Sequence, residues 1–179
     1  MTETLQKRKV IVLGFDGMDY DSTKALIEKG ALPNLAALAR LGHFAPLQSV
    51  FPPDSIPSWI TMFTGLDPSD HGVLDHVNYL LPEKDSPKVD TSVFHGKTLW
   101  DRIGNEAGAE VCIVNPYMAY PVWPVNGVMI SGPVFMKGDI QVSDPARING
   151  IPVPKSMGGI DDLPGRKDIK PFYERTLSD

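Results

Sequence analysis

Asp16 is the first residue whose type and position could do chemistry. It follows the apolar, β-branched run of residues 9–15 and precedes Gly17. If that run is a strand, the carboxylate lies at the carboxyl edge of a sheet, where open α/β proteins bind ligands. A strand end would hold it firmly enough to bind a divalent cation. From the Asp-Gly pair alone, however, a cap on the turn into the next helix is the more common role.

Ser55 is the second candidate, because it lies just before a predicted helix over residues 57–64. A hydroxyl at a helix N-terminus faces unpaired backbone N–H groups and the positive end of the helix dipole, which favour an anion. This environment suits a nucleophile that attacks a phosphate. No general base is evident nearby, so a metal ion bound by Asp16 would have to activate it. An ordinary N-cap is the structural alternative, and Ser58 is the competing hydroxyl.

Two histidines, His71 and His76, each follow an aspartate directly, as metal ligands often do. Asp67-Pro68 and His71-Gly72 are turn signals, however, and residues gathered in one turn usually serve its hydrogen bonds. A structural role is therefore favoured for His71. His76 lies past the turn, where the chain could return toward Ser55. The sequence holds no zinc-finger pattern, Gly-rich phosphate loop or dinucleotide fingerprint.

The composition excludes several classes of protein. Of the 179 residues, 17 are Lys or Arg and 22 are Asp or Glu, and a net charge of −5 has the wrong sign for binding a nucleic-acid backbone. A hydrophobic content of 42% is that of a globular domain. No run reaches the roughly 18 apolar residues of a membrane span, and no targeting segment is evident, so we expect a cytoplasmic protein that binds no membrane. The single cysteine, Cys112, is expected to be buried in a strand.

The elements that must position these residues alternate between strand and helix patterns, which predicts a layered α/β fold with a mostly parallel sheet and helices on both faces. The predicted strands are residues 9–15, 47–51, 110–115 and 127–131. The first predicted helix is capped by Asp21 or Ser22 and runs to Lys29. The other predicted helices are residues 33–41, 57–64 and 97–107.

Regular patterns stop at Gly132, and the remaining residues are rich in proline and glycine. We therefore divide the chain into residues 1–132, an α/β part, and residues 133–179, an irregular extension. An extension of this length without elements is typical of a domain that lacks a partner or its remaining part.

Four motifs, in this order and spacing, resemble the N-terminal part of the alkaline phosphatase superfamily. They are VIVLGFDGMD at residues 10–19, LPNL at 32–35, PPDSIPSW at 52–59 and TGLDPSDHG at 64–72. Within the superfamily they are similar to the type I phosphodiesterase and nucleotide pyrophosphatase branch, especially its prokaryotic predicted phosphohydrolase or phosphomutase members. Residues 97–101 and 114–132 resemble the same group, so the resemblance covers about residues 9–132.

The resemblance implies an alkaline-phosphatase-like fold and a role for each matching residue. Asp16 matches the first metal-binding aspartate, and Ser55 matches the nucleophile, whose oxygen is held by the same metal. The family uses two divalent ions, commonly zinc, although oxygen ligands also suit manganese or magnesium. The implied reaction is in-line attack on a small phosphoester, a phosphoserine intermediate, then hydrolysis or transfer. An asparagine that contacts the phosphate aligns with His76, so His76 or Asn78 is the substitute here.

The chain also departs from the family pattern, because no histidine follows Gly132, whereas the family's remaining ligands are downstream aspartates and histidines. One interpretation is the first part of a longer metal-dependent phosphoester hydrolase. The other is a catalytically inactive binding or oligomerisation domain, whose extension could cover a second copy in a homo-oligomer. A sulfatase is disfavoured because Trp59 stands where that group has arginine.

Overall fold

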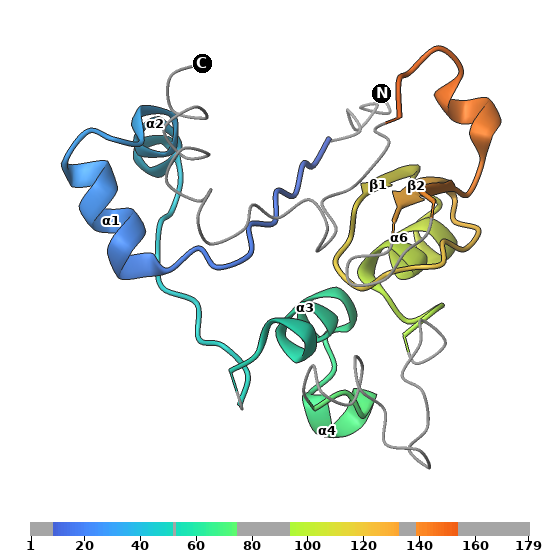
Figure 1. Cartoon of the computed structure of the whole chain (residues 1–179), viewed down its shortest axis with the longest axis horizontal. Coiled ribbons are helices and arrows are strands. Elements are labelled where there is room, and N and C mark those ends of the chain that lie inside the picture. Colours follow the sequence, from blue (N-terminus) through green and yellow to red (C-terminus); the bar gives the residue numbers. More distant parts are fainter. Residues whose placement is uncertain (1–8, 52, 75–93, 133–138, 154–179) are drawn as a thin grey trace, which may run out of the picture. The chain divides into compact units, whose positions relative to one another are not determined.

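The computed structural model describes residues 9–51, 53–74, 94–132 and 139–153 (Figure 1). The chain forms two compact units, Met1–Gln48 and Ser49–Asp179, and each is described by itself. The division at residue 132 expected from the sequence stays a prediction.

The first unit contains two helices, α1 (Tyr20–Glu28) and α2 (Pro33–Leu41). The Asp19 carboxylate accepts a hydrogen bond of 2.7 Å from the backbone N–H of Ser22, which makes Asp19 the N-cap of α1. The predicted cap at Asp21 or Ser22 was wrong by two or three residues. The predicted bounds of α2 are confirmed, since proline opens that helix and Gly42 ends it.

Residues 9–15 are not a strand, which corrects the first strand prediction. The run is extended but unpaired, and its apolar side chains are 60–83% exposed. The predicted strand over residues 47–51 is also absent, and Leu47 and Phe51 are 89% and 90% exposed. An apolar, β-branched run becomes a strand only when a neighbouring strand satisfies its backbone groups. No strand in the described ranges pairs with either segment.

The second unit contains the helices α3 (Ser55–Thr64), α4 (Pro68–His71) and α6 (Leu99–Glu106). The sequence predicted α3 and α6 to within two residues at each end, whereas α4 was expected only as a turn. The longest of these helices, α3, has 10 residues. None of the helices in the described ranges is long and apolar enough to cross a membrane.

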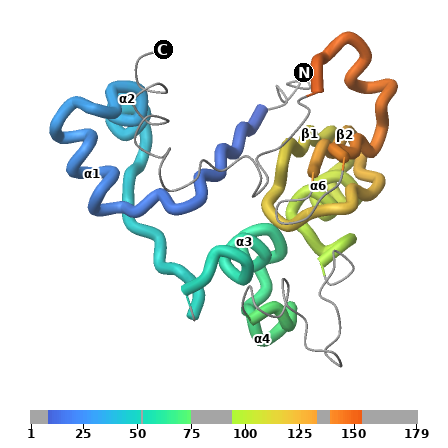
Figure 2. The backbone as a smooth tube through the Cα atoms, viewed as in Figure 1, coloured from blue at the N-terminus to red at the C-terminus, as the bar shows by residue number. Residues whose placement is uncertain are grey.

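A three-stranded sheet completes the second unit, in the order β1 (Val111–Val114), β2 (Gly127–Ser131) and β3 (Gln141–Val142). β1 and β2 are parallel, with Val111 opposite Gly127, whereas β3 is antiparallel to β2. The backbone passes from α6 directly into β1 and returns through a loop to β2 (Figure 2). The mixed α/β class is therefore confirmed, while the described sheet is small and mixed rather than mostly parallel. A short 3₁₀ helix, η2 (Pro145–Ile148), follows β3.

Aromatic residues and large aliphatic side chains build the core of the second unit. Trp100 and Trp123 are 9% and 4% exposed and stack on one another, and Phe94 is fully buried, while Trp59 is half-buried. Ile56 and Ile60 attach α3 to this core. Cys112 lies in β1, as predicted, but its side chain is exposed, because alternate residues of that strand face away from the core.

Candidate functional site

Ser55 is the first residue of α3, and its side chain is exposed. The helix starts there because Asp54 is extended and its Oδ1 accepts a 2.9 Å hydrogen bond from the N–H of Ile56. Asp54 is therefore the N-cap, and the alternative interpretation of Ser55 as an ordinary cap was wrong. Ser55 instead has the position expected of a hydroxyl that a rigid helix presents to a ligand.

Ser58, the competing hydroxyl, is occupied within the helix start. Its Oγ donates a 2.6 Å hydrogen bond to the Asp54 carbonyl. Since that proton is used, the 3.3 Å contact between the hydroxyls of Ser49 and Ser58 places Ser49 as the donor. The Ser58 side chain is half-buried, whereas that of Ser55 is exposed. Of the two hydroxyls, that of Ser55 is therefore the more accessible to a ligand.

The start of α3 offers few backbone donors for an anion. The N–H of Ile56 already donates to Asp54, and Pro57 has no N–H. No side chain within the helix is charged, so none of them reduces the positive potential at its N-terminus. The negative carboxylate of the N-cap Asp54, however, does lie at that end. The start of α3 therefore offers an anion fewer backbone N–H groups than the sequence led us to expect. A phosphate at Ser55 would need further positive groups from outside α3.

His71, the last residue of α4, is buried at 4% exposure beneath α3. Its Nε2 lies 3.1 Å from the Thr61 Oγ1, and its Nδ1 accepts a 3.2 Å hydrogen bond from the N–H of Val73. Burial lowers the pKa of the imidazole below its ordinary value of 6.5, against the opposing effects of the Pro57 carbonyl and of nearby aspartates. These contacts agree with the structural role that the turn signals favoured for His71.

Asp16 lies in the first unit, in the turn before Gly17, and its side chain is exposed. The helix that follows is capped by Asp19 rather than Asp16. His76 and Asn78, the candidate substrate contacts, lie outside the described residues. Across residues 9–51, 53–74, 94–132 and 139–153, no three His, Cys, Asp or Glu side chains gather in a cluster that could hold a metal ion.

Two residues that matter for the helix start were not found from the sequence. Asp54 was passed over because Pro57 was taken as the beginning of the helix, although an aspartate followed by Ser-Ile-Pro is itself an N-cap signal. Thr61 gave no signal at all, because its partner His71 is 10 residues away across a turn.

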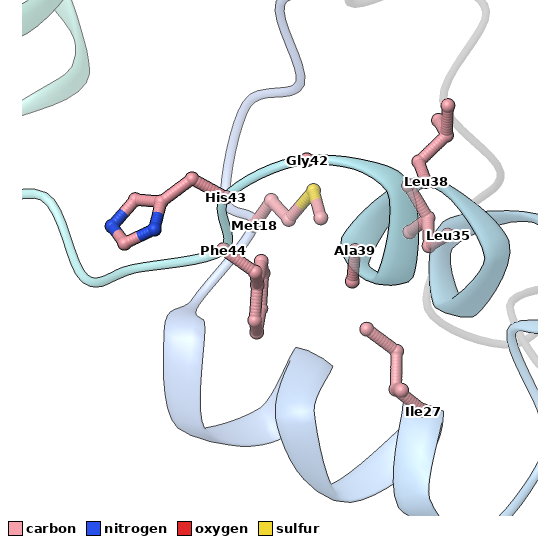
Figure 3. Close-up of a pocket in the computed structure, with 8 residues that line it drawn as sticks. All are labelled: Met18, Ile27, Leu35, Leu38, Ala39, Gly42, His43 and Phe44. Carbon is pink, nitrogen blue, oxygen red and sulfur yellow. The ribbon is translucent and has the colours of Figure 1, made fainter.

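The first unit holds a shallow apolar pocket between α1 and α2 (Figure 3). Met18, Ile27 and Phe44 point toward its interior, whereas the ring of His43, its one ionisable side chain, points away. The lining therefore offers contacts for an apolar group and no catalytic chemistry.

A mixed α/β fold with an exposed serine at a helix start is compatible with a hydrolase that uses a serine nucleophile. The chain matches the family model for type I phosphodiesterases and nucleotide pyrophosphatases over residues 10–156 of its 179 residues. It therefore belongs to this phosphoester hydrolase family, and the resemblance carried by the motifs is confirmed. The match extends past Gly132 through β3 and η2. No curated protein and no solved structure matches the chain.

Proposed function

We propose that this chain carries the nucleophile of a metal-dependent phosphoester hydrolase, with Ser55 as that nucleophile. The observation that supports the proposal most directly is the position of Ser55, exposed at the first residue of α3 within a chain of this family. Ser58, the other hydroxyl of the helix start, donates to the backbone and is half-buried.

In the proposed reaction, the Ser55 Oγ attacks phosphorus in line with the ester oxygen that leaves. The O–P bond to serine forms as the bond to the leaving group breaks, and the hydroxyl proton passes to solvent. Water then attacks the phosphoserine, releasing phosphate or a phosphomonoester and restoring the hydroxyl. Asp54 and Ser58 fix the first turn of α3, which limits the positions the Ser55 hydroxyl can take before attack.

We also propose two divalent metal ions, with zinc as the first candidate and manganese or magnesium as the others, and with Asp16 and Ser55 as ligands of one ion. A carboxylate and a serine oxygen suit such an ion chemically, but they do not complete its coordination, and no cluster of three ligands lies within the described part of the chain. Further ligands must come from elsewhere. When bound, such ions would favour the deprotonated serine and offset the charge of the phosphate.

The proposed substrate is a small phosphoester, and His76 or Asn78 is proposed to contact its phosphate. The need for such contacts is consistent with the few backbone donors at the start of α3. A cytoplasmic location is proposed on the sequence pattern alone.

The second candidate function is a binding or oligomerisation domain that keeps the family fold without catalysis, in a homo-oligomer. The observation that favours it is the lack of a three-ligand cluster in the described residues.

The deciding experiment is hydrolysis of an aryl phosphodiester and an aryl phosphomonoester by the purified chain with added zinc. We expect Ser55→Ala to lower kcat by about 10³-fold or more, because it removes the attacking oxygen. Ser58→Ala is the matched control: it removes a contact within the first turn but not the attacking oxygen, so its kcat should fall far less than that of Ser55→Ala. Acid quenching during turnover of the aryl phosphomonoester should leave one phosphate on Ser55, detected by mass. Equal activity of the Ser55→Ala variant and the wild type would reject Ser55 as the nucleophile.

The metal proposal is tested by zinc titration of the chain and of Asp16→Ala. We expect the variant to lose affinity by about 10-fold or more, because a carboxylate ligand is removed. Asp21→Ala, another exposed aspartate of the same unit, is the control. If neither hydrolysis nor zinc binding is found and light scattering detects a stable oligomer, the second candidate function is supported.

A further inference from the structure

The inference concerns how the start of α3 is held in place, and it rests on the proposed role of Ser55. Asp54 secures that start by accepting hydrogen bonds from the backbone N–H groups of Ile56 and Ser58, which belong to the same helix. A contact from outside comes from α4, which lies beside α3 (Figure 1). His71 is the residue that makes it.

The hydrogen bonds of His71 define which of its nitrogens carries the proton. The N–H of Val73 donates to Nδ1, so Nδ1 is unprotonated and the neutral ring carries its hydrogen on Nε2. That nitrogen lies 3.1 Å from the Thr61 Oγ1 on α3, and the Pro57 carbonyl is also near the ring. The ring therefore joins the turn after α4 to the first two turns of α3.

The backbone around His71 is arranged to hold the ring in this orientation. Asp67 caps α4, and its carbonyl accepts a 3.0 Å hydrogen bond from the N–H of His71. Gly72 is left-handed, with φ of 76°, and its N–H bonds to the Pro68 carbonyl. This turn brings the N–H of Val73 back onto the imidazole. A residue with a Cβ would be strained at Gly72, so the glycine is needed for the turn that orients the His71 ring.

We propose that His71 is a positioning residue for Ser55. Pro57 is two residues from Ser55, and Thr61 lies about 9 Å from Ser55 along the helix axis at 1.5 Å per residue. Ile56 and Ile60 press α3 onto the core through apolar contacts, which are not directional. The hydrogen bond between Nε2 and the Thr61 hydroxyl is directional, so it fixes the rotation and axial position of α3 and hence the direction from which the Ser55 hydroxyl attacks.

Two pairs of variants test the positioning role through catalysis. His71→Gln keeps an amide N–H near the Nε2 position, whereas His71→Asn keeps an acceptor near Nδ1 and loses the reach to α3. Thr61→Val removes the acceptor on α3 and keeps its shape. Thr64→Val is the matched control, because the Thr64 hydroxyl bonds within the other end of the same helix.

We expect His71→Asn to lower kcat by about 10- to 100-fold and Thr61→Val by about 3- to 10-fold, each with KM nearly unchanged, because misplacement of a reacting group slows the chemical step. His71→Gln should retain more activity than His71→Asn. Thr64→Val should keep kcat even where its loss of stability equals that of Thr61→Val. A rise in KM alone, or equal loss of kcat in the two threonine variants, would overturn the proposal.

A second measurement does not depend on activity. Amide hydrogen exchange of Ile56, Ser58 and Trp59 reports how firmly the first turn of α3 is held. We expect about 10-fold faster exchange at these amides in Thr61→Val and His71→Asn, and little change in Thr64→Val. Unchanged exchange would reject His71 as the anchor even in an active enzyme. If the wild-type chain is inactive but the exchange result holds, the proposed function fails while the anchoring of α3 by His71 stands.

Discussion

The indole Nε1 of Trp123 donates a 2.9 Å hydrogen bond to Oδ1 of Asp101, and both residues are buried. The other carboxylate oxygen accepts from the hydroxyl of Thr98 at 2.6 Å and from its backbone N–H at 3.2 Å. One carboxylate thus satisfies three donors. It joins the capping box at the start of α6 to the loop that leads into β2.

Removing this carboxylate should destabilise the second unit strongly. We expect Asp101→Ala to lower the free energy of unfolding by about 3–5 kcal/mol, because three buried donors lose their acceptor. Asp101→Asn should cost about 1–3 kcal/mol, since one oxygen remains. Urea denaturation followed by tryptophan fluorescence measures both. Glu106→Ala, at an exposed position of the same helix, should stay within about 0.5 kcal/mol. A comparable loss in that control would argue against the carboxylate as the cause.

Gly127 of β2 lies opposite Val111 of β1, and the space beside it is filled by the Val111 backbone. A Cβ built there would lie 1.9 Å from the carbonyl oxygen of Val111, and the φ of 146° also excludes other residues. We therefore expect Gly127→Ala to prevent folding of the second unit or to cost more than about 4 kcal/mol. Gly96→Ala, at φ of 78° in open space, should cost only about 1–2 kcal/mol. Circular dichroism and urea denaturation compare them. Equal losses would mean that φ, rather than the clash, sets the cost.

The elements that the sequence predicted well carry their own local signals. For α6, Thr98 and Asp101 form a capping box three residues apart, and Gly108 follows the helix. For β2, an apolar run begins at Gly127 and ends at Ser131. The bounds in these cases are set by residues adjacent in the chain. Local pattern was sufficient to find them.

Where the prediction was wrong, the deciding partner is distant in the chain or lies on another strand. Residues 9–15 have the composition of a central strand, yet the backbone hydrogen bonds that would make them one depend on a neighbour. The exposure of Cys112 depends on which face of β1 the core covers, which a four-residue apolar run does not specify.

For the candidate site, too, the sequence predicted the features that depend on neighbouring residues and missed those that depend on distant ones. Ser55 was located correctly at a helix start, because proline and serine signals gather there, but the cap was assigned one residue too late. The pairing of His71 with Thr61 joins two helices and has no counterpart in sequence spacing. Motif order supplied the family, whereas the contacts that hold the start of α3 in place needed the structure.

Asp54 should govern both the stability of α3 and the rate at Ser55. We expect Asp54→Ala to lower the free energy of unfolding by about 1 kcal/mol, because the N–H of Ile56 loses its cap. If Ser55 is the nucleophile, the same change should lower kcat through fraying of the first turn. Asp54→Asn, which keeps a side-chain acceptor, should restore most of both properties. Urea denaturation and aryl phosphodiester hydrolysis measure them. An Asn variant as impaired as the Ala variant would point to the charge instead of the cap.

The lowered pKa of His71 predicts how stability changes with pH. Burial keeps the ring neutral in the folded chain below 6.5, while the unfolded chain takes up a proton near that value. Between the two pKa values the unfolded state binds more protons, so the free energy of unfolding falls as the pH drops through this window. Above it, both states are neutral and His71 contributes no pH dependence.

The measurement is urea denaturation of the wild type and of His71→Gln at several pH values from about 7.5 down to about 5. Carboxylates contribute alike in both chains, so the difference between the two curves isolates the histidine. We expect the wild type to lose stability more steeply than the variant as the pH falls below about 6.5. His43→Gln, at an exposed ring of the first unit, is the matched control for the loss of one histidine. Parallel curves for the wild type and His71→Gln would show that the imidazole tolerates protonation in the folded chain, in which case the hydrogen bond from Val73 cannot hold the ring as described.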